Sequence, residues 1–349
     1  MVKVYLSDNS LSGHHKSYLD ALVKIECTDN ISEQITFEQT KGRLIYHTER
    51  LKYINNAIRK AQIDEYRGLK IVHFLYLDNL YTSLFSSAFF KSDKIRLIGT
   101  LHHIPQKKVK LFMLKIFAKK LDKIVVHSEY SKQELNNSGI NNVEFINYPS
   151  FYDYSKCSSK ETIRNEFGID QQQIVLTAIG GTRFDKGLDI LLDSVALLEP
   201  NERKRILLNI VGKEEIFKKG YILEKCSENG IDSRVKLEYL SDEDFMKNIK
   251  ISDAIVLPYR KVFSGNSGPM TEAIVNNIPI ISPEEGNLGY ITSKLSLGVT
   301  FESENVKSLS KTIKKVINEG FDLGVNHTDE FHVMKFTEKY KTIYFSLTL

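Results

Sequence analysis

The sequence predicts an α/β protein with two doubly wound parallel sheets in tandem. Apolar, β-branched runs alternate with helical patterns along the whole 349 residues, which is typical of strands that are paired in parallel and connected by helices. The alternation stops once, near residues 149–160. In the second half, two glycine-rich turns stand where a strand gives way to a helix. These observations together predict two Rossmann-like domains.

The composition is that of a globular protein of ordinary charge. A net charge of +4 gives no case for a nucleic-acid binder. Three widely spaced cysteines, Cys27, Cys157 and Cys226, argue against a disulfide framework and for a reducing compartment. The first ten residues read as a strand and not as a signal peptide, and no apolar run reaches the length of a membrane span. We therefore expect a cytoplasmic protein.

The first half contains five apolar runs that fit buried parallel strands. They lack the polar alternation of half-exposed strands, so both of their faces should be covered. Helical patterns separate them, as in residues 15–25 and 49–66. The predicted strands are residues 2–6, 70–77, 94–101, 123–128 and 143–148.

A second series of strands follows a candidate linker at residues 149–160, where Tyr148-Pro149 ends a strand and no apolar periodicity follows. We expect one domain over residues 1–150 and another over 151–325, with a C-terminal helix in 326–349 that can pack back toward the first. The predicted strands are 173–180, 205–212, 234–240, 253–259, 278–282 and 298–302. Two such sheets with right-handed crossovers would leave a ligand cleft at the carboxyl ends of their strands.

The first chemical segment is the turn after residues 173–180. Gly180 and Gly181 would let backbone N–H groups approach an anion, and the following helix would add its positive end. Arg183 and Lys186 can reach the same place and neutralise a diphosphate. A tight turn with two solvated cations is the alternative interpretation, and this motif alone does not separate the two.

The second segment follows the predicted strand 253–259. Its loop residues are Ser264, Gly265, Asn266, Ser267 and Gly268. Pro269 suits the first turn of a helix, so the N–H groups of Ser267, Gly268 and Met270 would form an anion site. Glu272, one turn further, can accept hydrogen bonds from ribose hydroxyls, or it can simply complement the helix dipole.

These two segments resemble the GT-B glycosyltransferases, and within them the retaining family 4 enzymes. In that family an arginine and a lysine after a glycine-rich strand end hold the donor diphosphate, and Arg183 and Lys186 stand in those places. Glu272 matches the glutamate that binds the donor ribose, and residues 277–281 match the short proline-containing strand that follows. The resemblance implies a fold of two Rossmann-like domains that face each other across a cleft. It covers nearly the whole chain and is strongest over residues 174–290.

One residue departs from the family pattern. The family has a further glutamate eight residues before the ribose-binding one, where it contacts the donor sugar, and this chain has Ser264 there. The departure bears on sugar contacts and on rate, while the backbone of residues 265–268 can still hold phosphate. The family often contacts the donor base after the strand at 234–240, which here places Tyr239 and Leu240 near the base.

The first domain supplies the acceptor side in such enzymes. Gly13 and His14 follow the first strand and resemble the family's glycine-containing first loop, which lies against the donor diphosphate and the acceptor. His102 and His103 end the strand 94–101, where the family often has a histidine near the reacting sugar. An imidazole there can donate or accept a hydrogen bond. The alternative is a pair of structural histidines.

The mechanism implied by the resemblance is direct transfer of a sugar with retention of anomeric configuration. Arg183, Lys186 and helix N-termini would neutralise the leaving diphosphate, with His102 and His103 near the reacting sugar. No group of residues in the sequence has metal-ligand spacing, and GT-B enzymes generally work without a bound divalent ion. We therefore expect no metal and no cofactor besides the nucleotide-sugar substrate.

Residues 107–123 are strongly basic, with seven lysines and one acid, Asp122. Lys108, Lys115 and Lys119 fall on one helical stripe, and apolar side chains cover much of the rest. Such a helix suits an anionic lipid surface, or it is a crossover helix whose cations lie in water. Many relatives use lipid-linked acceptors at the cytoplasmic membrane, so we expect peripheral contact with the inner face of the plasma membrane.

The sequence as a whole predicts a glycosyltransferase that moves a sugar from a nucleotide-diphosphate donor to a saccharide or a lipid-linked saccharide. Two alternatives stay open at this point. One is a GT-B sugar-nucleotide epimerase, which would need no separate acceptor. The other is a non-catalytic partner subunit of another glycosyltransferase, with Ser264 marking a decayed site.

Overall fold

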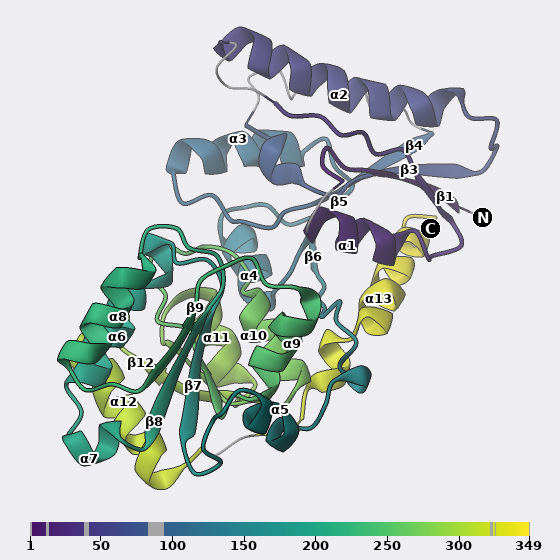
Figure 1. The fold of residues 1–349 in the computed structure, drawn as a ribbon. Helices are drawn as coiled ribbons and strands as arrows, with labels where there is room; N and C mark the ends of the chain where they lie inside the picture. The colour runs from purple at the N-terminus through teal and green to yellow at the C-terminus, as the bar shows by residue number, and fades with distance from the viewer. Residues whose placement is uncertain are drawn as a thin grey trace. The chain divides into compact units, whose positions relative to one another are not determined.

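The computed structural model describes residues 2–11, 14–37, 42–82, 94–321, 324 and 326–348. The chain divides into two compact units, residues 1–148 with 333–349 and residues 149–332 (Figure 1). In its described part, each unit holds one six-stranded sheet in which every neighbouring pair is parallel. The predicted fold class, two doubly wound parallel sheets, is confirmed.

The sheet of the first unit has the order β2-β1-β3-β4-β5-β6. Its strands are β1 (Val2–Ser7), β2 (Thr28–Asn30), β3 (Leu69–Phe74), β4 (Ile95–Thr100), β5 (Lys123–Val126) and β6 (Val143–Phe145). The five predicted strands are present, and β2 was not predicted. Its three residues, TDN, carry no apolar side chain, and it pairs with β1 at the edge of the sheet, from Val4 opposite Thr28.

Helices cover both faces of this sheet. Those of the unit are α1 (His14–Leu22), α2 (Arg43–Ile63), α3 (Lys108–Ala118), α4 (Glu129–Asn137) and α13 (Val333–Ser346). The helices α2 and α3 lie on one face, where Ile54 and Phe117 pack with Val72 and Leu97 of the strands, and α1 and α13 lie on the other (Figure 1). The C-terminal helix α13 contacts α1 and β1.

The sheet of the second unit has the order β12-β11-β10-β7-β8-β9. Its strands are β7 (Ile174–Ile179), β8 (Ile206–Val211), β9 (Ser233–Lys236), β10 (Ala254–Val256), β11 (Ile280–Pro283) and β12 (Gly298–Phe301). All six lie within or next to the predicted ranges. Every residue of β8, ILLNIV, is buried, as expected for a central strand that is covered on both faces.

Helices also form two layers around this second sheet. The helices are α5 (Lys160–Glu166), α6 (Leu188–Ala196), α7 (Pro200–Arg203), α8 (Lys219–Glu228), α9 (Asp242–Lys250), α10 (Gly268–Val275), α11 (Gly286–Lys294) and α12 (Val306–Glu319). Side chains of α6, α8 and α12 share one apolar core, and those of α9, α10 and α11 share another on the opposite face. Burial of both faces is the main stabilisation of such a sheet.

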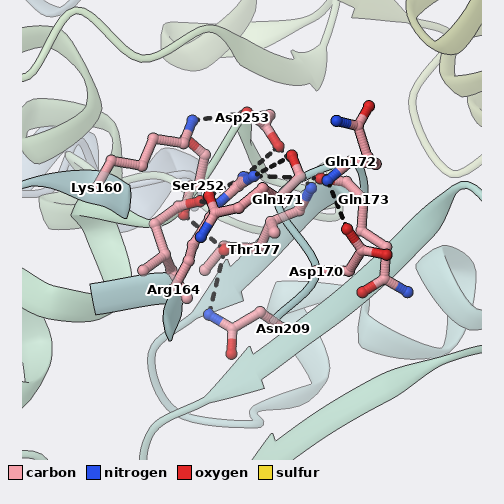
Figure 2. A network of polar contacts seen from close by, with 12 residues as sticks. Lys160, Arg164, Asp170, Gln171, Gln172, Gln173, Thr177, Asn209, Ser252 and Asp253 are labelled. Atoms are coloured by element: carbon pink, nitrogen blue, oxygen red, sulfur yellow. Dashed lines mark hydrogen bonds and ion pairs between the residues drawn. The ribbon is translucent and has the colours of Figure 1, made fainter. Parts of the chain in front are cut away.

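A polar network around the buried Arg164 connects α5 to the start of the sheet (Figure 2). Arg164 donates to the carbonyl of Ile251 and pairs with Asp253, and Lys160 also reaches Asp253, at 2.6 Å. Asp253 in turn accepts the backbone N–H of Val175 at 2.7 Å. The network lies at the amino ends of β7 and β10. It therefore stabilises the end of the sheet that is opposite to the ligand loops.

The chain order of the strands reverses at one point in each sheet. In the second unit, β7 and β10 are neighbours, and the chain leaves them toward opposite edges. In the first unit, the same holds for β1 and β3. The crevice beyond the carboxyl ends of such a strand pair is where open α/β sheets bind ligands. The loops after β7, β10, β1 and β3 are therefore the expected ligand-binding loops.

Candidate functional site

The loop after β7 carries the predicted diphosphate residues. Gly180 and Gly181 directly follow the strand, and Thr182 Oγ1 accepts the backbone N–H of Glu215 at 2.7 Å. Arg183 is half exposed and donates from Nε and Nη2 to the two carboxylate oxygens of Asp185, at 2.9 and 2.7 Å. Arg183 thus holds the pKa of Asp185 below its usual value. The guanidinium is preorganised but already has an anionic partner.

Gly187 permits this loop to lie against the loop after β10. Its φ of 62° is left-handed, and a Cβ on it would lie 1.9 Å from the carbonyl oxygen of Pro258. Arg260 closes the contact, because its backbone N–H donates to Asp185 O at 2.9 Å and its guanidinium donates to Phe184 O and Asp189, both at 2.6 Å. The loops of the two switch-point strands are therefore one assembly.

Lys186 lies in a small hollow at the carboxyl end of β7. Its ammonium stands 3.6 Å from the ring centroid of Tyr259 and 4.3 Å from that of Phe263, so two aromatic faces hold the cation. The hydroxyl oxygens of Tyr259 and Ser267 are 3.1 Å apart, which links the hollow to the start of α10. The hollow is lined by Ala178, Ile179, Gly180, Gly181, Thr182, Lys186, Leu188, Ile210, Val256, Pro258 and Tyr259.

The start of α10 differs in one respect from the prediction. Ser267 is the N-cap residue, and its Oγ accepts the N–H of Met270 at 3.4 Å. The sequence led us to expect a free N–H at Met270 for an anion. In the structure this N–H is instead bonded to the cap residue Ser267. Gly268 keeps open space on its Cβ side, and Asn266 accepts a hydrogen bond from the side chain of Asn287 at 3.0 Å. Ser264 is half-buried in the same loop.

Glu272 is on the inner side of α10, where only 4% of it is exposed. Its Oε2 accepts the hydroxyl of Ser150 at 2.7 Å. Burial raises the pKa of Glu272 to about 7, against the opposing effect of the Ser150 and Tyr154 hydroxyls. Glu272 does not line the hollow around Lys186, so its contact with a donor ribose stays a prediction.

Tyr239 and Leu240 also lie apart from that hollow. The strand β9 ends at Lys236, earlier than predicted, so both residues belong to the connection to α9. Tyr239 is 87% exposed. The contact of Tyr239 and Leu240 with a donor base stays a prediction.

In the first unit, His102 has a defined environment after β4. Its Nε2 donates to the carbonyl of Leu75 at 3.0 Å, and its ring stacks on Tyr76 with centroids 3.9 Å apart. Burial lowers the pKa of His102 to about 3, so the imidazole is neutral at pH 7. Because Nε2 carries the proton, Nδ1 is left as a hydrogen-bond acceptor.

His103 is exposed beside it, and Asp78 fixes both residues. The carboxylate of Asp78 accepts the backbone N–H groups of His102 and His103, at 3.0 and 2.8 Å. Burial raises the pKa of Asp78, while these hydrogen bonds oppose the shift. Of the predicted residues of the first loop, Gly13 and the side chain of His14 lie outside the described residues.

The basic helix α3 exposes apolar side chains together with its lysines. Val109 is 72% and Phe112 is 62% exposed, and Ile116, one turn on, is 38% exposed. Leu114 and Phe117 on the opposite side are buried. The predicted lysines Lys108, Lys115 and Lys119 are all exposed. The exposed side of α3 therefore presents both lysine side chains and large apolar side chains to solvent.

Among the described residues, no three His, Cys, Asp or Glu side chains are grouped so that they could hold a metal ion. None of the helices in that part of the chain combines the length and the apolar character that a membrane crossing requires.

Comparison with known families decides the class. Residues 159–328, almost the whole second unit, match the profile of the group 1 glycosyl transferases. This part of the chain belongs to the group 1 glycosyl transferases. Such enzymes transfer a sugar from a nucleotide-sugar donor, and the predicted family is thereby confirmed. Comparison with curated proteins by sequence gave no match.

Solved structures confirm the GT-B fold of this glycosyltransferase. Sucrose-phosphate synthase from Thermosynechococcus elongatus is similar with a TM-score of 0.73 at 13% identity, with 99% of each chain covered. Alr3699/HepE from Anabaena, solved in complex with UDP, has a TM-score of 0.71 at 13% identity, over 99% of this chain and 100% of that one. WaaG, a glycosyltransferase involved in lipopolysaccharide biosynthesis, has a TM-score of 0.63 at 12% identity, with 99% of each chain covered.

Sequence reasoning missed several residues around the glycosyltransferase site. Tyr259 and Phe263 hold the ammonium of Lys186, and Arg260 joins the two loops. The available signal was the segment YRKVF, whose aromatic and cationic residues begin at the last position of a predicted strand. Ser150 was missed too, because its partner Glu272 is 122 positions away and no local pattern joins them.

Proposed function

We propose that this glycosyltransferase is a retaining enzyme that transfers a sugar from a nucleotide-diphosphate donor to a saccharide or lipid-linked saccharide acceptor. The observation that carries the proposal is the hollow at the β7–β10 switch point, where Lys186 is held between Tyr259 and Phe263 beside Gly180 and Gly181. It joins a cation and a glycine turn at the place where this fold binds ligands. Alr3699/HepE, a structural neighbour, has been solved with UDP-glucose.

In this proposal Lys186 and Arg183 bind the donor diphosphate and neutralise the charge of the leaving group. Lys186 offers an ammonium without a carboxylate partner among the described residues, so its charge is available. Arg183 shares its charge with Asp185, and its planar fork can exchange one carboxylate contact for a phosphate oxygen. Ser267 and Gly268 present the N-terminus of α10 to the same anion.

The donor ribose and base are assigned to Glu272 and to Tyr239 with Leu240. Glu272 can serve a ribose only by sharing a carboxylate that already accepts from Ser150. A carboxylate has room for several hydrogen bonds, so the two partners need not exclude each other. Ser264, Asn266 and their neighbours would face the sugar and the phosphates.

On the acceptor side, His102 would accept a hydrogen bond from a sugar hydroxyl through Nδ1. Its neutral state at pH 7 and its fixed tautomer favour that role over charge neutralisation. His103 is exposed next to it and can contribute a second polar contact. The assignment of Gly13 and His14 to donor binding rests on the family resemblance of their loop.

The exposed face of α3 supports a lipid-linked acceptor. Lysines and the side chains of Val109, Phe112 and Ile116 meet water on one helix, which is the chemistry that binds an anionic lipid surface. The enzyme would then work at the cytoplasmic face of the plasma membrane, in the synthesis of a polysaccharide or glycoconjugate.

A panel of nucleotides and nucleotide sugars tests the proposal. Binding of UDP or GDP and of their sugars should raise the melting temperature by mass action. Lys186→Met should lose at least tenfold in diphosphate affinity, because one charge-assisted contact disappears. Lys218→Met is the matched control, since Lys218 is an exposed lysine of the same unit paired with Glu214.

Product analysis completes the experiment. Hydrolysis of a nucleotide sugar to free sugar with retained configuration, or transfer to an added saccharide, supports the proposal. An isomerised nucleotide sugar would identify an epimerase. Binding without any turnover, relieved only by a second protein, would identify a partner subunit. Equal loss of the nucleotide response in both lysine variants would overturn the assignment of the hollow.

A further inference from the structure

The loop after β1 contains a histidine–carboxylate pair that the proposed function does not use. Asp8 follows β1 directly, and its side chain has no exposed area. Its two oxygens lie 2.9 and 3.1 Å from Nδ1 of His15, on α1. The backbone N–H of Ser10 also donates to Asp8, at 3.0 Å. Both carboxylate oxygens face Nδ1 and act as acceptors, so Nδ1 is the nitrogen of His15 that donates, and this bond fixes the tautomer.

Aromatic stacking fixes the orientation of the same imidazole. The rings of His15 and Tyr76 are stacked with centroids 3.6 Å apart, and Tyr76 is stacked on His102 at 3.9 Å. The three rings follow β1, β3 and β4, which are adjacent strands. The column thus spans the β1–β3 switch point of the first unit, where ligands are expected.

The hydrogen bonds of the buried histidines show what a structural role looks like in this unit. His73 is fully buried, and its two nitrogens bond Tyr344 Oη at 2.8 Å and Thr100 Oγ1 at 2.9 Å. His127 is buried as well, with Nδ1 on the carbonyl of Ile146 at 3.0 Å and Nε2 3.4 Å from Tyr18 Oη. Both rings use both nitrogens.

Within the described residues, His15 and His102 each form a hydrogen bond through only one ring nitrogen. The side chain of His15 is 24% exposed, and no group in the described part of the chain bonds its Nε2. His102 has the mirror arrangement, with Nε2 bonded and Nδ1 open. A fixed tautomer, a fixed ring and one open lone pair are what an enzyme needs to receive a hydroxyl proton in a hydrogen bond.

We propose that His15 is a sugar-binding residue whose Nε2 accepts a hydrogen bond from a sugar hydroxyl, with Asp8 as its positioning residue. The inference rests on the proposed function and deepens it, since it makes the stacked column of His15, Tyr76 and His102 a polyhydroxylic binding site. The hydroxyl can belong to the acceptor or to the sugar of the donor, and the experiment separates these sources.

The test observes the imidazole itself in the full-length protein. Side-chain ¹H–¹⁵N correlation spectra assign His15 by its loss in His15→Phe, which keeps a ring to stack on Tyr76. The wild-type signal should be that of the Nδ1-protonated tautomer. In Asp8→Asn the tautomer should become mixed, because an amide can either accept from or donate to Nδ1. A merely structural pair would give no response to sugar in either protein.

Ligand additions identify the source of the hydroxyl. The probes are UDP, GDP, UDP-glucose, UDP-galactose, UDP-N-acetylglucosamine, GDP-mannose and the methyl glycosides of these sugars. A shift of His15 Nε2 with a methyl glycoside in the presence of UDP or GDP assigns the acceptor. A shift with a nucleotide sugar but not with its free nucleotide assigns the donor sugar. Absence of both shifts at millimolar sugar overturns the inference.

Variants give the matching affinities. His15→Phe should weaken the sugar that shifts His15 by about tenfold, as expected for one lost hydrogen bond to an uncharged group, and should leave the melting response to UDP or GDP unchanged. The double variant Asp8→Asn with His15→Phe removes the buried charge left behind and controls for folding. An unchanged sugar affinity in both variants would contradict the inference and leave the proposed function standing. Loss of the UDP and GDP response in the wild type would refute the proposed function itself.

Discussion

The hydroxyl of Ser150 donates to Oε2 of Glu272 across 2.7 Å, and this bond joins α10 to the segments where the chain passes between its two units. The backbone N–H of Ser150 donates to Phe331 O at 2.9 Å, and Ser150 also forms a parallel bridge with His332. Both crossing segments therefore lie together beside one carboxylate. Glu272 lies about one turn into α10, the helix that begins at the candidate phosphate site. Substitutions of Glu272 should therefore affect both the start of α10 and the segment around Ser150.

The pH dependence of stability should carry the signature of Glu272. Burial raises the pKa of Glu272 in the folded protein to about 7, from an ordinary value of 4.5. Below about pH 4.5 the group is protonated in both states and adds no penalty. Between these values the unfolded chain loses the proton first, so stability falls as the pH rises, by about 3 kcal/mol in all.

Glu272→Gln removes that titration and should flatten the fall. Unfolding by urea at pH 5 and pH 8 measures it, and the variant should gain on the wild type at pH 8. Ser150→Ala should steepen the fall in stability with rising pH, because the ionised carboxylate of Glu272 loses a hydrogen-bond donor. Parallel pH profiles for wild type and Glu272→Gln would show that the group does not titrate in this range.

Two glycines with the same backbone conformation should respond very differently to alanine. Gly187 and Gly168 have φ values of 62° and 66°. A Cβ on Gly187 would lie 1.9 Å from Pro258 O, while one on Gly168 would have nothing within 4 Å. Gly168→Ala should cost about 1 kcal/mol for the left-handed backbone. Gly187→Ala should cost about 3 kcal/mol or more and weaken nucleotide binding, because the two loops must separate. Equal melting temperatures for the two variants would exclude the close approach.

The network of Figure 2 predicts unequal roles for two cations on one carboxylate. Arg164 is buried and Lys160 is partly exposed, and both pair with Asp253. Arg164→Met should destabilise by about 3 kcal/mol or more, because it takes the buried partner from Asp253 and leaves the carbonyl of Ile251 without its guanidinium donor. Lys160→Met should cost about 1 kcal/mol or less. Denaturant midpoints measure both, and a larger loss for Lys160→Met would contradict the assignment.

The same network should make the protein acid-sensitive. Burial opposes ionisation of Asp253, but hydrogen bonds from Lys160, Val175 and Arg164 outweigh it and lower its pKa. The stabilisation from an acid with a lowered pKa is present above its ordinary value of 3.8 and is lost as the pH falls through the folded value. Asp253→Asn should therefore flatten the acid limb of the stability profile.

Local patterns were sufficient for most of the fold. Both faces of a central strand such as β8 are buried, and its nearly continuous apolar sequence, ILLNIV, is enough to predict this. The strand β2 escaped because TDN has no apolar residue and forms only through pairing with β1. An edge strand of this kind forms because it pairs with the neighbouring strand, and its own sequence does not indicate it.

The site was predictable only where its chemistry is local. Gly180, Gly181, Arg183 and Lys186 follow one strand, and three of them line one hollow. The partners of Arg183 and Glu272, which are Asp185 and Ser150, decide how much charge is free, and they emerge only in three dimensions. The same is true of His15, because no local pattern indicates its pairing with Asp8.

The exposed face of α3 gives the last prediction, on membrane contact. Lys108, Lys115 and Lys119 stand beside the exposed Val109 and Phe112. Replacing the three lysines with Glu should weaken binding to vesicles of phosphatidylglycerol and phosphatidylcholine about 100-fold, since each cation contributes about 1 kcal/mol at such a surface. Phe112→Ser should weaken the binding that survives high salt, because that part depends on apolar burial.

The control for this experiment is a second triple variant with the same change of charge. Lys307, Lys311 and Lys315 are exposed on α12 of the other unit, and their replacement with Glu alters the net charge equally. Sedimentation with vesicles at low salt should separate the two proteins, with the α12 variant bound nearly as well as the wild type. Equal losses would mean that net charge alone drives the adsorption, and undiminished binding of the α3 variant would remove the membrane from the proposed function while leaving sugar transfer intact.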